Sequence, residues 1–159
     1  MLRPYFLLYF LFVQLLSTAQ NQDPPILDFS QLQPYLQKNN DTIYVVNFWA
    51  TWCKPCVEEL PYIEQLHEDT FTHPVEILLV SLDFRNQVQD KLIPFIRDKM
   101  IRSDVVVLDD PDANSWIDKV DPRWSGAIPA TLIYHGEEKL FFPEGFENYQ
   151  TVREIISNF

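Results

Sequence analysis

Two β-branched, strongly apolar runs constrain the fold of this chain more than any other feature. The first is TIYVVNFWA at residues 42–50, and the second is VEILLVSLD at residues 75–83. Both are too apolar for strands with one face in water, so they predict strands that are buried on both faces. The segment between them repeats apolar residues at helical spacing, at Leu60, Ile63 and Leu66. Strand, helix and strand in this order predict a parallel pair within a helix-covered sheet.

The rest of the chain continues the alternation of strands and helices. Before residue 42 we expect a short strand and then a helix that begins at Ser30, with Pro34 in its first turn. The later elements are expected to be a helix at 87–100 interrupted at Pro94, a strand at 104–109, a helix at 112–120, a hairpin of strands 130–135 and 139–146, and a helix at 148–159. The sequence therefore predicts one α/β domain with a central mixed β-sheet flanked by helices.

The first residues have the three-part pattern of a secretory signal peptide. Arg3 supplies the positive charge, residues 5–16 form an apolar run, and residues 17–19 offer the small side chains of a cleavage site. We therefore expect a signal peptide at 1–19 and an exported, periplasmic domain at 20–159 that is soluble after cleavage. An uncleaved membrane anchor is the alternative, although a membrane span needs about 20 apolar residues.

The charge of the chain restricts its partners. The net charge is −11, which argues against binding to nucleic acid or to an anionic membrane surface. With 159 residues and 47% hydrophobic residues, the chain suits a single domain with a packed core. We expect a monomer without a nucleic-acid partner.

Both cysteines of the chain lie in one turn, Cys53-Lys54-Pro55-Cys56, between the first buried strand and the following helix. A helix N-terminus stabilises a thiolate and so lowers the pKa of Cys53, and Lys54 adds a positive charge that acts in the same direction. Pro55 fits the first helical turn, where no N–H is needed. A disulfide across so small a loop restricts the unfolded chain little, which favours a chemical over a structural role. Cys53 is then the attacking nucleophile and Cys56 the resolving cysteine.

Other interpretations of the cysteine pair remain open at this point. A metal site is not expected, because there is no second CxxC and the three histidines, His67, His73 and His135, show no ligand spacing. No cofactor is expected either. A merely structural disulfide and a binding module with inert cysteines are alternatives, and a peroxide-reducing enzyme has only Thr51 in its favour.

Several motifs resemble a known family. The stretch FWATWCKPC at 48–56 resembles the active site of thioredoxin-fold proteins, and it is most similar to exported TlpA-like thiol–disulfide oxidoreductases. Pro61 stands eight positions after Cys53, where thioredoxins have a helix-kinking proline. The later segment GAIPATLIY resembles the cis-proline segment of the family, so Pro129 would form a cis peptide bond and Ile128 would face the cysteines.

The resemblance extends roughly over residues 42–159 and implies both a fold and a function. The expected fold is thioredoxin-like, and the expected activity is disulfide exchange with protein thiols or disulfides as substrates. Within that activity the resemblance favours a reductase, which would need a membrane electron donor in an exported compartment. A disulfide oxidase or isomerase is the nearest alternative.

The sequence departs from thioredoxins at the residue that would handle protons. Asn47 stands where thioredoxins have a buried aspartate, and an amide cannot accept the proton of the resolving cysteine. Asp83, at the end of the second buried strand, is the candidate acceptor, with a solvated end-of-strand carboxylate as the alternative. Glu58 and Glu59 are expected to be surface charges.

The tryptophans near the cysteines have different expected roles. Trp52 is expected to border the sulfur, whereas Trp49 is expected in the core. Trp124 suits either place, because tryptophans are often highly buried. An exposed apolar rim at the cysteines would suit the binding of extended protein segments.

Overall fold

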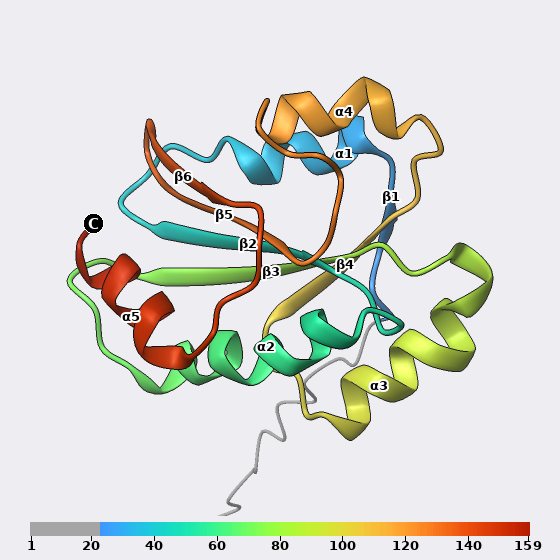
Figure 1. Ribbon diagram of the computed structural model, residues 1–159, viewed down its shortest axis with the longest axis horizontal. Helices are drawn as coiled ribbons and strands as arrows, with labels where there is room; N and C mark the ends of the chain where they lie inside the picture. The colour runs from blue at the N-terminus through green and yellow to red at the C-terminus, as the bar shows by residue number, and fades with distance from the viewer. Residues whose placement is uncertain (1–22) are drawn as a thin grey trace, which may run out of the picture.

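A six-stranded mixed sheet forms the centre of the computed structural model, which describes residues 23–159 (Figure 1). Its order is β1-β4-β3-β2-β5-β6. The strands are β1 Ile26–Leu27, β2 Ile43–Trp49, β3 Val75–Ser81, β4 Asp104–Leu108, β5 Ala130–His135 and β6 Glu138–Phe142. The first four are mutually parallel, while β5 runs antiparallel to β2 and β6 antiparallel to β5. The predicted α/β class with a mixed sheet is confirmed.

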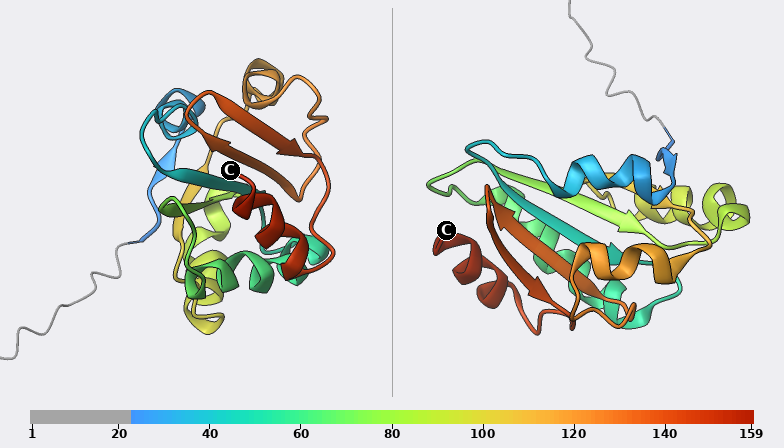
Figure 2. Two further views of the ribbon diagram at one scale, coloured as in Figure 1. Left: turned by 90° about the vertical axis from the view of Figure 1, so that its left-hand side faces the viewer. Right: turned by 90° about the horizontal axis from the view of Figure 1, so that it is seen from above.

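Helices cover both faces of this sheet, as Figures 1 and 2 show. One face carries α1 Phe29–Leu32 and α4 Ala113–Val120, and the other carries α2 Lys54–Glu64, α3 Ile93–Asp98 and α5 Tyr149–Ser157. Successive side chains of a strand point to opposite faces, so β2 contributes to two cores. Val45 and Trp49 pack toward α2, whereas Tyr44 and Phe48 pack toward α1. All seven residues of β2 are buried, as its apolar sequence predicts.

Proline explains how the interrupted helix is built. The expected helix at 87–100 consists of a 3₁₀ turn at Arg85–Gln87, a π-helical turn at Val88–Leu92, and α3. Pro94 lies in the first turn of α3, directly after the π-helical turn, to which it has no N–H to donate. The expected interruption is therefore a change from π-helical to α-helical turns at Leu92–Ile93, and the helix continues through Pro94.

Two element boundaries differ from the sequence expectation. The first helix begins at Phe29, because the Asp28 side chain accepts the Gln31 N–H and caps it, and Pro34 lies in a 3₁₀ turn that follows this helix. Strand β6 ends at Phe142 and does not extend to residue 146. Residues 143–146 instead turn back toward α2, where they contact the candidate site.

The expected signal peptide at residues 1–19 lies outside the described residues. Within residues 23–159, no helix is both long and apolar enough to cross a membrane.

Candidate active site

The two cysteines lie where β2 leads into α2. Cys53 is the N-cap residue of α2, and Pro55 lies in the first helical turn. The cysteines form a disulfide, with 2.02 Å between the sulfur atoms. The Cys56 N–H points at Cys53 Sγ over 3.3 Å, which places Cys53 at the positive end of the helix. Cys53 is 6% exposed and Cys56 is completely buried, so a partner molecule can reach only Cys53.

Asp83 fixes the turn that precedes the cysteines. Its carboxylate accepts the Thr51 N–H at 3.0 Å, and it also accepts the Thr51 and Ser81 hydroxyl groups. Asp83 is only 2% exposed, so the expectation of a solvated carboxylate does not hold. Its oxygens are occupied by donors from the turn and from β3. Through these hydrogen bonds, Asp83 holds the turn before the cysteines in place.

The cis-proline segment lies directly beside Cys53. The peptide bond between Ile128 and Pro129 is cis, as the resemblance implies. The Ile128 carbonyl oxygen is 3.7 Å from Cys53 Sγ. Because a disulfide sulfur has no hydrogen to donate, this approach is a contact that brings the Ile128 backbone to the sulfur.

Aromatic side chains form part of the surface next to the cysteines. Trp52 is 55% exposed and stacks on Phe84, which is 63% exposed. Trp49 lies in the core as expected, and Trp124 is also core, because it packs on Phe48 and donates its indole N–H to the Ala127 carbonyl. Trp52 and Phe84 are the exposed aromatic pair at this end of the molecule.

The positive charge of Lys54 is partly offset by a glutamate on the same helix. The Lys54 ammonium lies 3.6 Å from the Glu58 carboxylate, one helical turn further on. Both side chains are largely exposed, and such pairs contribute little to stability. Glu58 is a surface charge, as expected.

Glu59 is buried, and the expectation that it is a surface charge is wrong. It is 2% exposed, and its two oxygens accept the Asn47 amide at 2.7 Å and the Phe146 N–H at 2.8 Å. The Asn47 amide nitrogen also donates to the Thr131 hydroxyl, whereas Asn47 Oδ1 has no hydrogen-bond partner among residues 23–159. Burial raises the pKa of Glu59 above its ordinary value of 4.5, although both hydrogen bonds oppose this. The site thus holds a buried carboxyl group whose affinity for a proton is increased by burial.

Sequence spacing contains the signal that would have located Glu59. It lies three residues after Cys56 and four before Ile63, and residues at these spacings share one face of a helix. Asn47 lies on the α2 side of β2 because it alternates with Val45 and Trp49. The buried acid and the buried amide therefore meet between β2 and α2.

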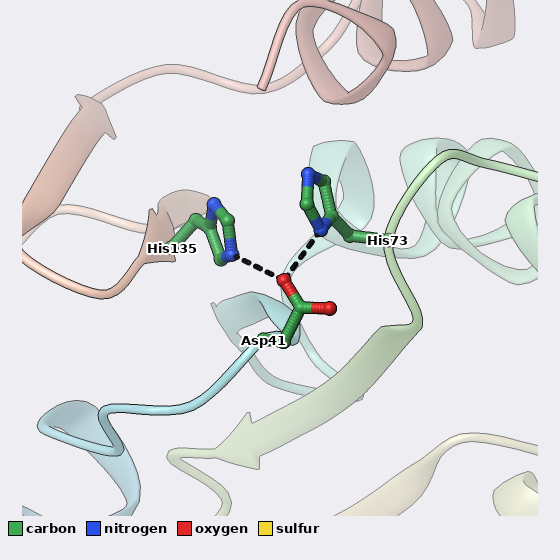
Figure 3. A group of neighbouring side chains, drawn as sticks. All are labelled: Asp41, His73 and His135. Atoms are coloured by element: carbon green, nitrogen blue, oxygen red, sulfur yellow. Dashed lines mark hydrogen bonds and ion pairs between the residues drawn. The ribbon is translucent and has the colours of Figure 1, made fainter.

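Potential metal ligands lie elsewhere in the molecule. Two of the three histidines, His73 and His135, lie together with Asp41 at the opposite end of the sheet (Figure 3). The spacing of the histidines in the sequence did not predict this grouping.

A helix-capping Cys-x-x-Cys pair with a cis-proline beside it, at one end of a helix-covered mixed sheet, defines a protein of the thioredoxin-fold class. Residues 21–140 match the AhpC/TSA family, and the chain belongs to this family. It is 47% identical over 49 residues to the thiol-disulfide oxidoreductase ResA of Oceanobacillus iheyensis, and 49% identical over 37 residues to ResA of Geobacillus kaustophilus. These segments are 31% and 23% of this chain, and they span only 26% and 21% of the relatives.

Solved structures support the same fold. The thioredoxin-related protein of Neisseria meningitidis serogroup B superimposes with a TM-score of 0.60 at 18% identity, over 73% of this chain and 83% of the other. The DsbF homologue of Corynebacterium diphtheriae gives a TM-score of 0.60 at 19% sequence identity, over 76% of this chain and 73% of the other chain. StoA of Bacillus subtilis gives a TM-score of 0.53 at 19% sequence identity, over 73% of this chain and 83% of the other chain. The resemblance to thioredoxin-fold oxidoreductases found in the sequence is confirmed.

Proposed function

We propose that this chain is an exported thiol–disulfide oxidoreductase that exchanges disulfides with other proteins through Cys53 and Cys56. The observation that carries the proposal is the difference between the two sulfurs. Cys53 is accessible at the start of α2 beside the Ile128 backbone, and Cys56 is buried behind it. This is the arrangement that an attacking and a resolving cysteine require.

The exchange proceeds in two balanced steps. In the reduced enzyme, the Cys53 thiolate attacks one sulfur of a substrate disulfide, which forms a mixed disulfide and releases the other substrate sulfur as a thiolate. Cys56 then loses its proton and attacks Cys53 Sγ, which releases the second substrate sulfur. The enzyme ends with the disulfide seen in the structure and the substrate has gained two electrons.

Glu59 is the proton acceptor in this proposal. The second step must remove a proton from Cys56, which is completely buried and out of reach of water. Glu59 is on the same helical face as Cys56, and burial raises the pKa of its carboxyl group despite the two hydrogen bonds that its oxygens accept. Asp83 is a positioning residue in this scheme, because its oxygens already hold the Thr51 turn.

The substrate is an extended segment of another protein. The backbone of Ile128 lies next to Cys53, and a peptide that pairs with it by strand addition would present its disulfide to the sulfur. Trp52 and Phe84 add exposed apolar area next to the turn for side chains of the bound segment.

We further propose that the protein works as a monomeric reductase outside the cytosol, in the periplasm, after removal of residues 1–19. The similarity of the motif to TlpA-like proteins supports this direction. A membrane electron donor would regenerate the dithiol there. Equilibration in a glutathione redox buffer tests the direction: a potential near −270 mV supports a reductase, and one near −120 mV supports an oxidase.

Cysteine variants test the roles of the two sulfurs. The reduced protein is mixed with a model protein disulfide, and products are separated without reductant. Cys56→Ser should accumulate the mixed disulfide, because the second step is blocked, while Cys53→Ser should form none. If Cys53→Ser reduces the substrate as fast as the wild type, Cys53 is not the attacking cysteine. If the reduced wild-type protein neither reduces the substrate nor forms a mixed disulfide, the proposed enzyme is wrong and a binding module with inert cysteines is favoured.

A further inference from the structure

Asp41, His73 and His135 converge at the end of the sheet opposite the cysteines (Figure 3). Asp41 precedes β2, His73 precedes β3, and His135 is the last residue of β5. Strands β2 and β3 are parallel, so their starting ends lie side by side, and antiparallel β5 finishes at that same edge. In the register of the sheet, Ile43 of β2 pairs with Val75 of β3 on one side and with His135 of β5 on the other. The topology of the sheet therefore brings three distant segments together.

The three side chains point to one place. A single oxygen, Asp41 Oδ1, lies 2.7 Å from His73 Nδ1 and 3.6 Å from His135 Nε2 (Figure 3). The three potential ligand atoms all lie within 4.8 Å of one another, and the imidazole centres are 4.4 Å apart. Ligand atoms bound to one tetrahedral zinc ion at about 2.1 Å are about 3.4 Å apart. The observed spacing therefore needs adjustments of about an ångström or less at each atom.

The surroundings allow this adjustment. The His73 and His135 side chains are 24% and 23% exposed, and His135 also rests against the Phe159 ring, so both imidazoles are held in place. Asp41 is 81% exposed and can swing to a metal ion without disturbing the core. Its exposure also leaves room for water as a further ligand.

We propose that Asp41, His73 and His135 form a binding site for one divalent transition-metal ion of the zinc type. Imidazole nitrogen with carboxylate oxygen is a donor set that Zn²⁺ and its neighbours favour, whereas Mg²⁺ and Ca²⁺ prefer oxygen ligands alone. Ion pairs would account for each imidazole contact with Asp41 taken alone. A metal ion accounts in addition for two imidazoles that lie 4.4 Å apart and approach the same oxygen. The net charge of −11 also favours a bound cation.

The site is separate from the thiol chemistry. The seven residues of β2 lie between Asp41 and the cysteine turn, which corresponds to roughly 20 Å at about 3.3 Å per residue. A metal ion at this distance does not touch either sulfur. It would join the segments before β2 and β3 to the end of β5, and so stabilise the folded state in proportion to its occupancy.

Calorimetric titration with Zn²⁺ tests the site in the full-length protein. The protein is first stripped with a chelator and kept in its disulfide form, so that no thiol competes for the metal. We expect one equivalent of bound Zn²⁺ and a rise in the melting temperature. His73→Asn and His135→Asn should each weaken binding at least tenfold and remove the thermal shift.

His67→Asn is the matched control, because His67 is the remaining histidine and bonds Ser103 away from the cluster. It should bind Zn²⁺ like the wild type. Asp41→Asn keeps the test valid if a histidine variant misfolds, since Asp41 is exposed, and it should also weaken binding. The proposal is overturned if Zn²⁺ gives neither heat nor thermal shift at tenfold excess, if Asp41→Asn and the folded histidine variants bind like the wild type, or if Mg²⁺ alone binds equally well.

Discussion

Replacing Glu59 by glutamine tests the proposed proton transfer most directly. Glutamine keeps the size of the side chain and can still accept the Phe146 N–H through its carbonyl oxygen. Its amide can donate to Asn47 Oδ1, which has no partner in the structure, once the Asn47 side chain turns over. The variant therefore keeps the packing between β2 and α2 but cannot accept a proton.

The size of the effect follows from the ionisation of Cys56 without a base. An unperturbed thiol is about 3% thiolate at pH 7. If Glu59 removes the proton during attack, the full population of Cys56 becomes available in place of this fraction. Loss of Glu59 should therefore slow the resolving step about 30-fold, which corresponds to ~2 kcal/mol in activation free energy. This lies below the range of about 100- to 10,000-fold that general acid–base catalysis usually contributes.

Stopped-flow reaction of the reduced protein with an aromatic disulfide such as Ellman's reagent resolves the two steps. The first thiolate is released when Cys53 attacks, and the second when Cys56 resolves the mixed disulfide. Glu59→Gln should leave the first phase unchanged and slow the second. The second phase of the wild type should rise with pH as Glu59 ionises above 4.5, and that of the variant only as the thiol itself ionises.

Glu58→Gln is the matched control, because Glu58 neighbours Glu59 on α2 but is exposed. It should resemble the wild type in both phases. If Glu59→Gln keeps the wild-type rate and pH profile of the second phase, Glu59 is not the acceptor. Asp83→Asn should then be measured in the same way.

Three further predictions concern stability. Burial raises the pKa of Glu59, so the contribution of this group to stability is complete below pH 4.5 and is lost as the pH rises through the raised pKa. Urea unfolding of the oxidised protein should show this decline in stability, and the Glu59→Gln variant should not show it. Gly145→Ala should cost about 1–3 kcal/mol in the same assay, because the new Cβ would lie 2.8 Å from Glu59 Oε2 and 2.9 Å from Pro129 Cγ; an unchanged midpoint would contradict this close packing. Burial raises the pKa of Tyr134 to about 12, so ultraviolet titration should show one tyrosine that ionises near that pH, and this transition should be absent in Tyr134→Phe. The same variant loses the hydrogen bond to the Tyr35 carbonyl, so its free energy of unfolding should fall by about 1 kcal/mol.

The fold was predictable because its main elements are encoded locally. The β-branched run at 42–50 is a central strand, and a helix changes its type of turn just before Pro94, for reasons that act within a few residues. The predicted hairpin was too long because the chain leaves the strand after Phe142, and the Phe146 N–H then bonds to Glu59 across 87 positions of the chain. No local pattern encodes such a contact.

The candidate site was predictable in part for the same reason. The two cysteines and the cis-proline lie in short motifs that can be read directly from the sequence. Helical spacing places Glu59 on the buried face beside Ile63, but carboxylates are rarely buried, so the sequence alone favours a surface position for it. His73 and His135 come from different strands, so only the register of the sheet brings them together.

The hydrogen bond from the Phe146 N–H to Glu59 gives the buried acid a natural spectroscopic label. The resonance of an amide proton depends on the charge of the oxygen that accepts it. In a heteronuclear NMR spectrum, the Phe146 cross-peak will therefore move as Glu59 gains or loses its proton. Because Phe146 is not part of the cysteine turn, the same peak can be followed in the dithiol and the disulfide protein. One backbone amide thus reads out how the redox state of two sulfurs is linked to the charge of one carboxyl group.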